Sequence, residues 1–179
     1  MRTVLVTGEI GSGKSEVCRY LASKGFPVYD SDSRTKALYD TVPGLLDRIE
    51  ETLGDCFRRE DGSLDRKKLG SVIFTDPEKR HALESVVYPE VVRDFTGWRD
   101  AQDAEIVFLE SAIALEKKEF DGLYDCVLAV TAPYEERLKR NPAAAQRSAS
   151  QHFDPAKADV LITNDADLDS LHRKIDNLL

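Results

Sequence analysis

The chain is poor in the residues that build disulfide frameworks and metal clusters. Its 179 residues include only three cysteines and three histidines. The histidines are scattered, without the spacing of zinc ligands. The cysteines lie far apart and form no C-x-x-C pair; they are Cys18, Cys56 and Cys126. The sequence therefore predicts neither a disulfide framework nor a zinc site.

Basic residues are also too few for a general anion-binding surface. The chain has 25 Lys and Arg against 33 Asp and Glu, which gives a net charge of −8 and argues against a nucleic-acid or anionic-membrane partner. It has no apolar run long enough to span a bilayer, and its first residues lead directly into a predicted strand without a signal sequence. We therefore expect a cytoplasmic protein whose positive charge is concentrated locally.

The apolar residues, 41% of the chain, suffice for one buried core with an inserted subdomain. Runs suited to buried strands occur at 3–7, 26–29, 105–109, 126–131 and 159–163. Helical patterns follow each run, which predicts a parallel sheet covered on both faces. Between 33 and 102 the patterns are helical only, so this block is predicted to be an insertion that forms one wall of a ligand cleft.

A phosphate-binding motif, G-x-x-x-x-G-K-[ST], connects the first predicted strand to a helical segment at 16–24. Its glycines let backbone N–H groups converge on phosphate oxygens at the positive end of a helix dipole. Its lysine, Lys14, is expected on the β/γ-phosphates and its hydroxyl, Ser15, on Mg²⁺. The expected nucleotide contacts are Gly8, Glu9, Ile10, Gly11, Ser12, Gly13, Lys14, Ser15 and Glu16.

Carboxylates follow two of the predicted strands. Asp30 and Asp32 come after the second strand and would point to the same side if that segment is extended. Phosphoryl transfer needs a carboxylate near the acceptor hydroxyl; Asp32 is our first choice and Asp30 our second. A turn that caps the next helix is the competing interpretation. Glu110 ends the third strand, where it either holds Mg²⁺ through water, positions the acceptor, or caps a helix.

Taken in order, these and later segments resemble the dephospho-CoA kinase family, which catalyses the last step of coenzyme A synthesis. The resemblance covers nearly the whole chain. Besides the loop and Asp30-Ser31-Asp32, its segments are G-S-L-D-R at 62–66, E-S-A-I-A-L-E at 110–116, Arg140, Arg147 with Gln151, and A-D-V-L-I-T-N at 158–164.

This resemblance implies an α/β P-loop NTPase fold: a five-stranded parallel sheet in the order 2-3-1-4-5, flanked by helices. It implies a nucleotide-binding core at 1–32 and 105–179, a short lid at about 141–152, and a helical acceptor-binding insertion at 33–104. The implied reaction is ATP-dependent phosphorylation of the ribose 3′-hydroxyl of dephospho-CoA, with Mg²⁺. We expect a monomer or a weak homo-oligomer whose partners are these small molecules.

The resemblance also implies site residues. The expected catalytic residues are Lys14, Asp32, Arg140 and Arg147. Asn164 is expected near the donor adenine, although Asn-Asp is also a common turn. The expected acceptor-side residues are Asp30, Asp32, Arg66, Tyr88 and Glu110. Alternative roles are a surface ion pair for Arg66 and ordinary charged helix faces for the two lid arginines.

Several positions depart from the family pattern: Glu9 and Glu16 add negative charge at the loop, Tyr88 replaces a histidine, Ala112 replaces a proline, and the lid is short. These departures leave two alternatives open. One is a kinase for another small acceptor, such as a nucleoside, a nucleotide or a sugar acid. The other is a non-catalytic paralogue that binds a nucleotide or a CoA derivative. A signalling GTPase is disfavoured because the N-K-x-D guanine motif is absent.

Overall fold

The computed structural model describes residues 1–147 and 154–179, and they form two compact units. The first comprises Met1–Asp30 and Ala101–Leu179, and the second comprises Ser31–Asp100. Among the described residues, no helix is both long and apolar enough to cross a membrane.

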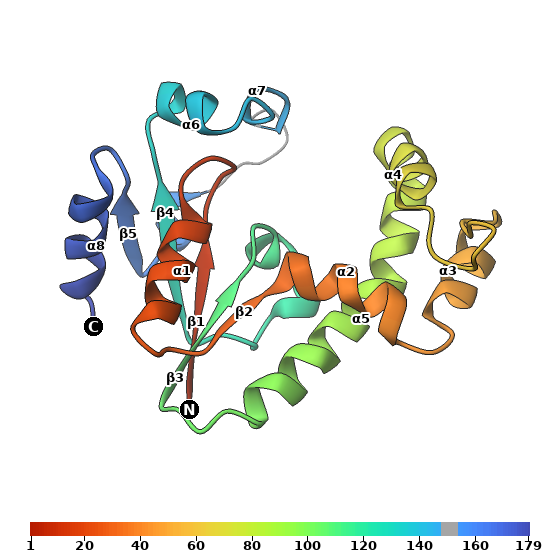
Figure 1. Cartoon of the computed structure of the whole chain (residues 1–179), viewed down its shortest axis with the longest axis horizontal. Helices are drawn as coiled ribbons and strands as arrows, with labels where there is room; N and C mark the ends of the chain where they lie inside the picture. Colours follow the sequence, from red (N-terminus) through yellow and green to blue (C-terminus); the bar gives the residue numbers. More distant parts are fainter. Residues whose placement is uncertain (148–153) are drawn as a thin grey trace. The chain divides into compact units, whose positions relative to one another are not determined.

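The first unit contains a five-stranded parallel sheet in the order β2-β3-β1-β4-β5 (Figure 1). This is the sheet and the order that the resemblance implied. Its strands lie within two residues of the expected runs, because continuous apolar stretches bounded by polar residues mark buried parallel strands clearly. Their bounds are β1 Arg2–Thr7, β2 Val28–Asp30, β3 Ile106–Glu110, β4 Cys126–Thr131 and β5 Val160–Thr163.

Helices α1 (Lys14–Ser23) and α8 (Leu168–Asp176) pack against each other and against the sheet. Val17 and Leu21 of α1 and Leu171 and Ile175 of α8 are buried with apolar side chains of β1, β3, β4 and β5. This packing holds the beginning of α1 at the carboxyl edge of the sheet. The other elements of this unit are η1 (Ala114–Glu116), η2 (Lys118–Phe120), α6 (Tyr134–Arg140), α7 (Ala144–Arg147) and η3 (Pro155–Lys157).

The second unit is helical, as the patterns predicted: α2 (Ser31–Thr41), α3 (Leu45–Leu53), α4 (Arg66–Thr75) and α5 (Pro77–Asp100). Helix α5 contacts each of the other three. It continues through Pro89 as one helix. Buried Leu83, Val87, Val91 and Phe95 lie on both sides of the proline. We infer that this packing keeps the helix continuous despite the hydrogen bond that proline cannot make.

Candidate nucleotide-binding site

The phosphate loop, residues 8–15, connects β1 to α1 and depends on glycine at three positions. Gly8, Gly11 and Gly13 have φ of 136°, 78° and 105°, a region that side chains disfavour. A Cβ on Gly8 would lie 2.0 Å from the carbonyl oxygen of Val130. A Cβ on Gly13 would lie 2.3 Å from Nδ2 of Asn164. The loop therefore follows this path only because these positions lack side chains.

Polar side chains from α6 and from Asn164, the residue after β5, contact the loop. The side chain of Asn164, which is buried, donates a 2.9 Å hydrogen bond from Nδ2 to the carbonyl oxygen of Ser12. Arg140 reaches the same carbonyl at 3.5 Å and that of Asn164 at 3.3 Å. The structure thus shows Asn164 supporting the loop, a contact that the sequence did not predict for it.

Lys14 and Ser15 form the first turn of α1, at the positive end of its dipole. The ammonium group of Lys14 donates to the carbonyl oxygen of Glu9 at 3.2 Å, so the lysine side chain folds back over the loop. The hydroxyl of Ser15 donates a 2.9 Å hydrogen bond to Oε1 of Glu110. A lysine and a hydroxyl so placed are those that bind polyphosphate and its metal ion.

Glu110 ends β3 beside Asp30, its register partner on β2. Partial burial raises the pKa of the Glu110 carboxyl, and the nearby Asp30 charge raises it further, against the hydrogen bond from Ser15 and the charge of Lys14. Beneath it, burial and the Glu110 carboxylate raise the pKa of the Cys18 thiol far above its ordinary value. Cys18 is therefore a neutral packing residue with a side-chain hydrogen bond to Glu110.

Hydroxyl and carboxylate oxygens are the ligands that Mg²⁺ prefers. A cation beside Glu110 would offset the cost of its burial, so the donor set fits this ion. Within the described residues there is no group of three or more His, Cys, Asp and Glu that could form a closed protein cage.

The segment after β2 is not extended. The strand ends at Asp30, and α2 begins at Ser31, so Asp32 lies in the first turn of a helix. The condition under which Asp30 and Asp32 would point to the same side, an extended segment, is therefore not met. Helix formation rotates successive side chains by about 100°, and an acidic residue in the first turn is favoured by the helix dipole. Both side chains are exposed.

In the second unit, the segment G-S-L-D-R builds a turn and a helix start. Asp65 caps α4 by accepting hydrogen bonds from the N–H groups of Lys67 and Lys68. Arg66 donates to Asp40 at 2.9 Å and to the carbonyl oxygen of Lys36 at 2.8 Å. The first three residues of this segment, 62–64, line a hollow of about 390 Å³ together with Tyr39, Asp40, Leu46, Arg58 and Asp61.

The remaining predicted residues are placed as follows. Tyr88 is half-buried in α5, next to Pro89. Arg140 ends α6, and Arg147 ends α7. Residues 148–153 lie outside the described residues. They include Gln151 and the end of the lid expected at about 141–152.

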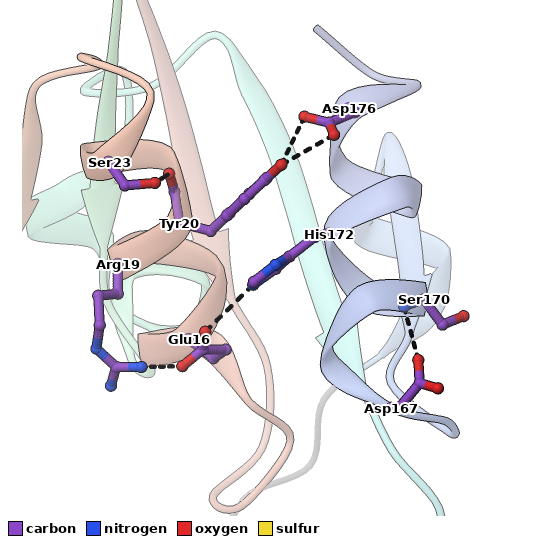
Figure 2. Close-up of polar contacts among 8 residues, drawn as sticks. All are labelled: Glu16, Arg19, Tyr20, Ser23, Asp167, Ser170, His172 and Asp176. Atoms are coloured by element: carbon purple, nitrogen blue, oxygen red, sulfur yellow. Dashed lines mark hydrogen bonds and ion pairs between the residues drawn. The ribbon is translucent and has the colours of Figure 1, made fainter.

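Glu16, the acidic residue after the loop, contacts two other side chains. It pairs with Arg19 one turn along α1, and its Oε1 lies 3.3 Å from Nε2 of His172 on α8 (Figure 2). The His172 ring stacks on Tyr20, with centroids 3.8 Å apart. The Tyr20 hydroxyl donates to Asp176 at 2.9 Å (Figure 2). The carboxylate of Glu16 is thus drawn toward α8.

Sequence reasoning missed Arg137. This residue is buried in α6, and its Nη1 lies 2.9 Å from Oε1 of Glu9 in the phosphate loop. One signal was available: Arg137 lies three residues before Arg140 on the same helix, a spacing that places two side chains on one face.

A parallel sheet in this order, with a glycine-rich phosphate loop, a lysine and a hydroxyl at its carboxyl edge, defines a P-loop kinase. Comparison with known proteins is more specific. The family model described as dephospho-CoA kinase matches residues 2–169. The chain belongs to the dephospho-CoA kinase family.

Individual relatives support the same family. A dephospho-CoA kinase of Porphyromonas gingivalis is 38% identical over 150 residues, 84% of this chain and 72% of the relative. One from Anaeromyxobacter dehalogenans is 34% identical over 193 residues, 100% of this chain and 91% of the relative. A crystal structure of a protein from Thermus thermophilus has a TM-score of 0.82 at 32% identity. The match covers 99% of this chain and 95% of the chain in that structure. A shikimate kinase from Acinetobacter baumannii shares the fold. Its TM-score is 0.57 at 21% identity, and the match covers 99% of this chain and 92% of the shikimate kinase.

Proposed function

We propose that this protein transfers the γ-phosphoryl group of ATP to the ribose 3′-hydroxyl of dephospho-CoA. One observation carries the proposal: an intact phosphate loop, with Lys14 and Ser15 in place, stands in a chain that matches the dephospho-CoA kinase family over residues 2–169. We propose a cytoplasmic enzyme that acts as a monomer or a weak homo-oligomer and needs no nucleic acid or membrane.

The phosphate loop binds the triphosphate through its backbone N–H groups and Lys14. Lys14 stabilises the negative charge on the transferring group, while Arg140 and Arg147 add positive charge from the lid side. Ser15 and, through water, Glu110 would hold Mg²⁺. When bound, this ion neutralises charge on the phosphate oxygens. Asn164 keeps the loop in place by its bond to Ser12.

On the acceptor side, we propose that the helical unit Ser31–Asp100 binds dephospho-CoA. Asp32 orients the 3′-hydroxyl and takes its proton as the phosphoryl group is transferred. Asp30 is the second candidate for that role. Arg66 and Tyr88 contact the acceptor, although Arg66 must then share its guanidinium with Asp40.

The proposal is tested by mixing the protein with ATP, Mg²⁺ and dephospho-CoA, measuring ADP release and identifying CoA by mass. We expect one CoA for each ADP. ADP release that does not depend on dephospho-CoA, or nucleotide binding without CoA, would contradict the proposal. In that case, a screen of nucleosides, nucleotides and sugar acids separates a kinase with another acceptor from a protein that only binds nucleotide.

A further inference from the structure

The second residue of the phosphate loop is acidic, and a buried arginine faces it. Glu9 follows Gly8, and its side chain is 22% exposed. The side chain of Arg137 is only 8% exposed, and its Nη1 lies 2.9 Å from Oε1 of Glu9. The two residues are far apart in the sequence, so only the fold brings them together.

The surroundings of Arg137 leave the Glu9 carboxylate as the main group that can offset the cost of burying its positive charge. Its guanidinium lies 5.5 Å from the ring centroid of Tyr134, a cation–π contact. Its Nε and Nη1 are buried, and neither makes a hydrogen bond in the part of the chain that the structure describes, so the contact of Nη1 with Glu9 is an ion pair. A buried cation with so few partners is unfavourable unless an anion lies beside it. The Glu9 carboxylate is that anion.

The backbone geometry confirms that the loop and α6 are in close contact at this point. A Cβ on Gly11 would lie 2.6 Å from the carbonyl oxygen of Arg137. The carbonyl oxygen of Glu9 itself accepts hydrogen bonds from Lys14 Nζ at 3.2 Å and from the N–H of Ser12 at 3.1 Å. Glu9 therefore touches the phosphate-binding lysine through its backbone and α6 through its side chain.

A carboxylate in a loop that binds triphosphate would repel its ligand if it were left unpaired. We infer that Arg137 neutralises Glu9, so that ATP can bind a loop that carries an extra acidic residue. In this inference Arg137 acts only through Glu9, and neither residue needs to touch the reacting atoms. The inference rests on the proposed function only in that the loop binds ATP.

A cycle of three variants tests this inference. The Kd for ATP·Mg²⁺ is measured for each variant by calorimetric titration without acceptor. In Arg137→Met, Glu9 is unpaired, and we expect the Kd for ATP to rise at least about fivefold, more at low salt. In Glu9→Gln alone, ATP should bind at least as tightly as to wild type, because the positive charge left on Arg137 attracts phosphate. The double variant should recover binding to within about threefold, since no unpaired carboxylate remains.

Two other roles for Arg137 predict different results. If Arg137 contacts the nucleotide directly, Glu9→Gln cannot restore binding to Arg137→Met. If Arg137 only stabilises the fold, thermal midpoints change while the Kd for ATP does not. Either result overturns the inference. Should Arg137→Met fail to fold, Arg137→Gln alone and with Glu9→Gln provides the same comparison.

The exposed pair between Lys139 and Glu136 on the same helix serves as a matched control. Lys139→Met and Glu136→Gln, alone and together, are expected to leave the Kd for ATP within about twofold, because surface pairs are weak and screened. The titration also separates the two proposals. If ATP binds and the cycle behaves as expected but no CoA forms, the proposed reaction fails and the inference stands.

Discussion

The hydroxyl of Ser15 donates a 2.9 Å hydrogen bond to Oε1 of Glu110, which joins the beginning of α1 to the end of β3. The carboxylate that accepts this bond is partly buried and has a raised pKa, so its charge is costly to the folded protein. A site that keeps a costly charge is a candidate functional site. We therefore expect Glu110 to lower stability and to support activity.

Glu110→Gln should raise the thermal midpoint at neutral pH, because the amide has no charge to desolvate, and it should lower kcat about a hundredfold or more by weakening Mg²⁺ binding. The half-saturating Mg²⁺ concentration should rise. The control is Glu105→Gln: Glu105 is exposed and lies before the opposite end of the same strand, so neither quantity should change. An unchanged Mg²⁺ dependence in Glu110→Gln would assign Glu110 a purely structural role.

Lys14→Met should lower kcat by about 10²–10³, because one donor aimed at the developing charge is lost. Lys24, just past the other end of α1, pairs with Asp176 on the protein surface. Lys24→Met is the control and should leave kcat within about twofold. ATP turnover and ATP binding are measured for both variants. Equal kcat in Lys14→Met and wild type would remove Lys14 from the mechanism.

Much of this architecture could be predicted from the sequence because its signals are local. The phosphate loop is one continuous motif, and each strand is one apolar run. The contacts that hold the loop could not be predicted, because Ser12 meets Asn164 and Glu9 meets Arg137 only after the sheet has formed. A loop residue gives no sign of which distant helix will lie against it.

The exact residues at which helices begin could not be predicted either. Asp30-Ser31-Asp32 contains turn-forming residues, and the patterns place the helix start at 33. The structure begins α2 at Ser31. Such boundaries depend on small local preferences that neighbouring packing overrides. As a result, one of the two candidate carboxylates, Asp30, ends a strand, and the other, Asp32, lies in the first turn of a helix.

Asp32→Asn and Asp30→Asn test which of the two carboxylates acts as the base on the acceptor hydroxyl. We expect Asp32→Asn to lower kcat by about 10²–10⁴, the range for loss of a general base. The KM for ATP should change less than about threefold, because a base on the acceptor hydroxyl does not bind the donor. Asp30→Asn should have a clearly smaller effect. Steady-state kinetics with varied ATP and varied dephospho-CoA provide the test. A larger loss in Asp30→Asn would exchange the two roles.

Glu16→Thr should lower the KM for ATP about two- to fivefold, since it removes a negative charge from a helix N-terminus that binds phosphate. The contact with His172 offsets part of that charge whenever the ring is protonated (Figure 2). His172→Phe keeps an aromatic ring for stacking on Tyr20 and removes the ring nitrogen. It should raise the KM for ATP slightly in wild type and not at all in the Glu16→Thr background. An equal rise in both backgrounds would rule out the pairing.

Glu90 in α5 provides a stability prediction for the helical unit. Its side chain is 4% exposed and accepts hydrogen bonds from Arg48 at 2.7 Å and Arg93 at 2.5 Å. The Arg48 hydrogen bond, helped by Arg93 and opposed by burial, lowers the pKa of the Glu90 carboxyl. Glu90→Gln should therefore lower the free energy of unfolding at neutral pH by about 1–3 kcal/mol, less than for a fully buried pair because both arginines are partly exposed.

The sign of the pH dependence follows from the lowered pKa. The folded state holds the carboxylate more strongly than the unfolded state does, so its contribution is complete above the unfolded pKa. It is lost as pH falls through the lower, folded pKa. The difference between wild type and Glu90→Gln should accordingly shrink in acid, when thermal midpoints are measured from neutral pH downward. Glu51→Gln, at an exposed site on α3, should show little difference at any pH. A wild-type advantage that persists or grows in acid would show that Glu90 acts through packing rather than through its charge.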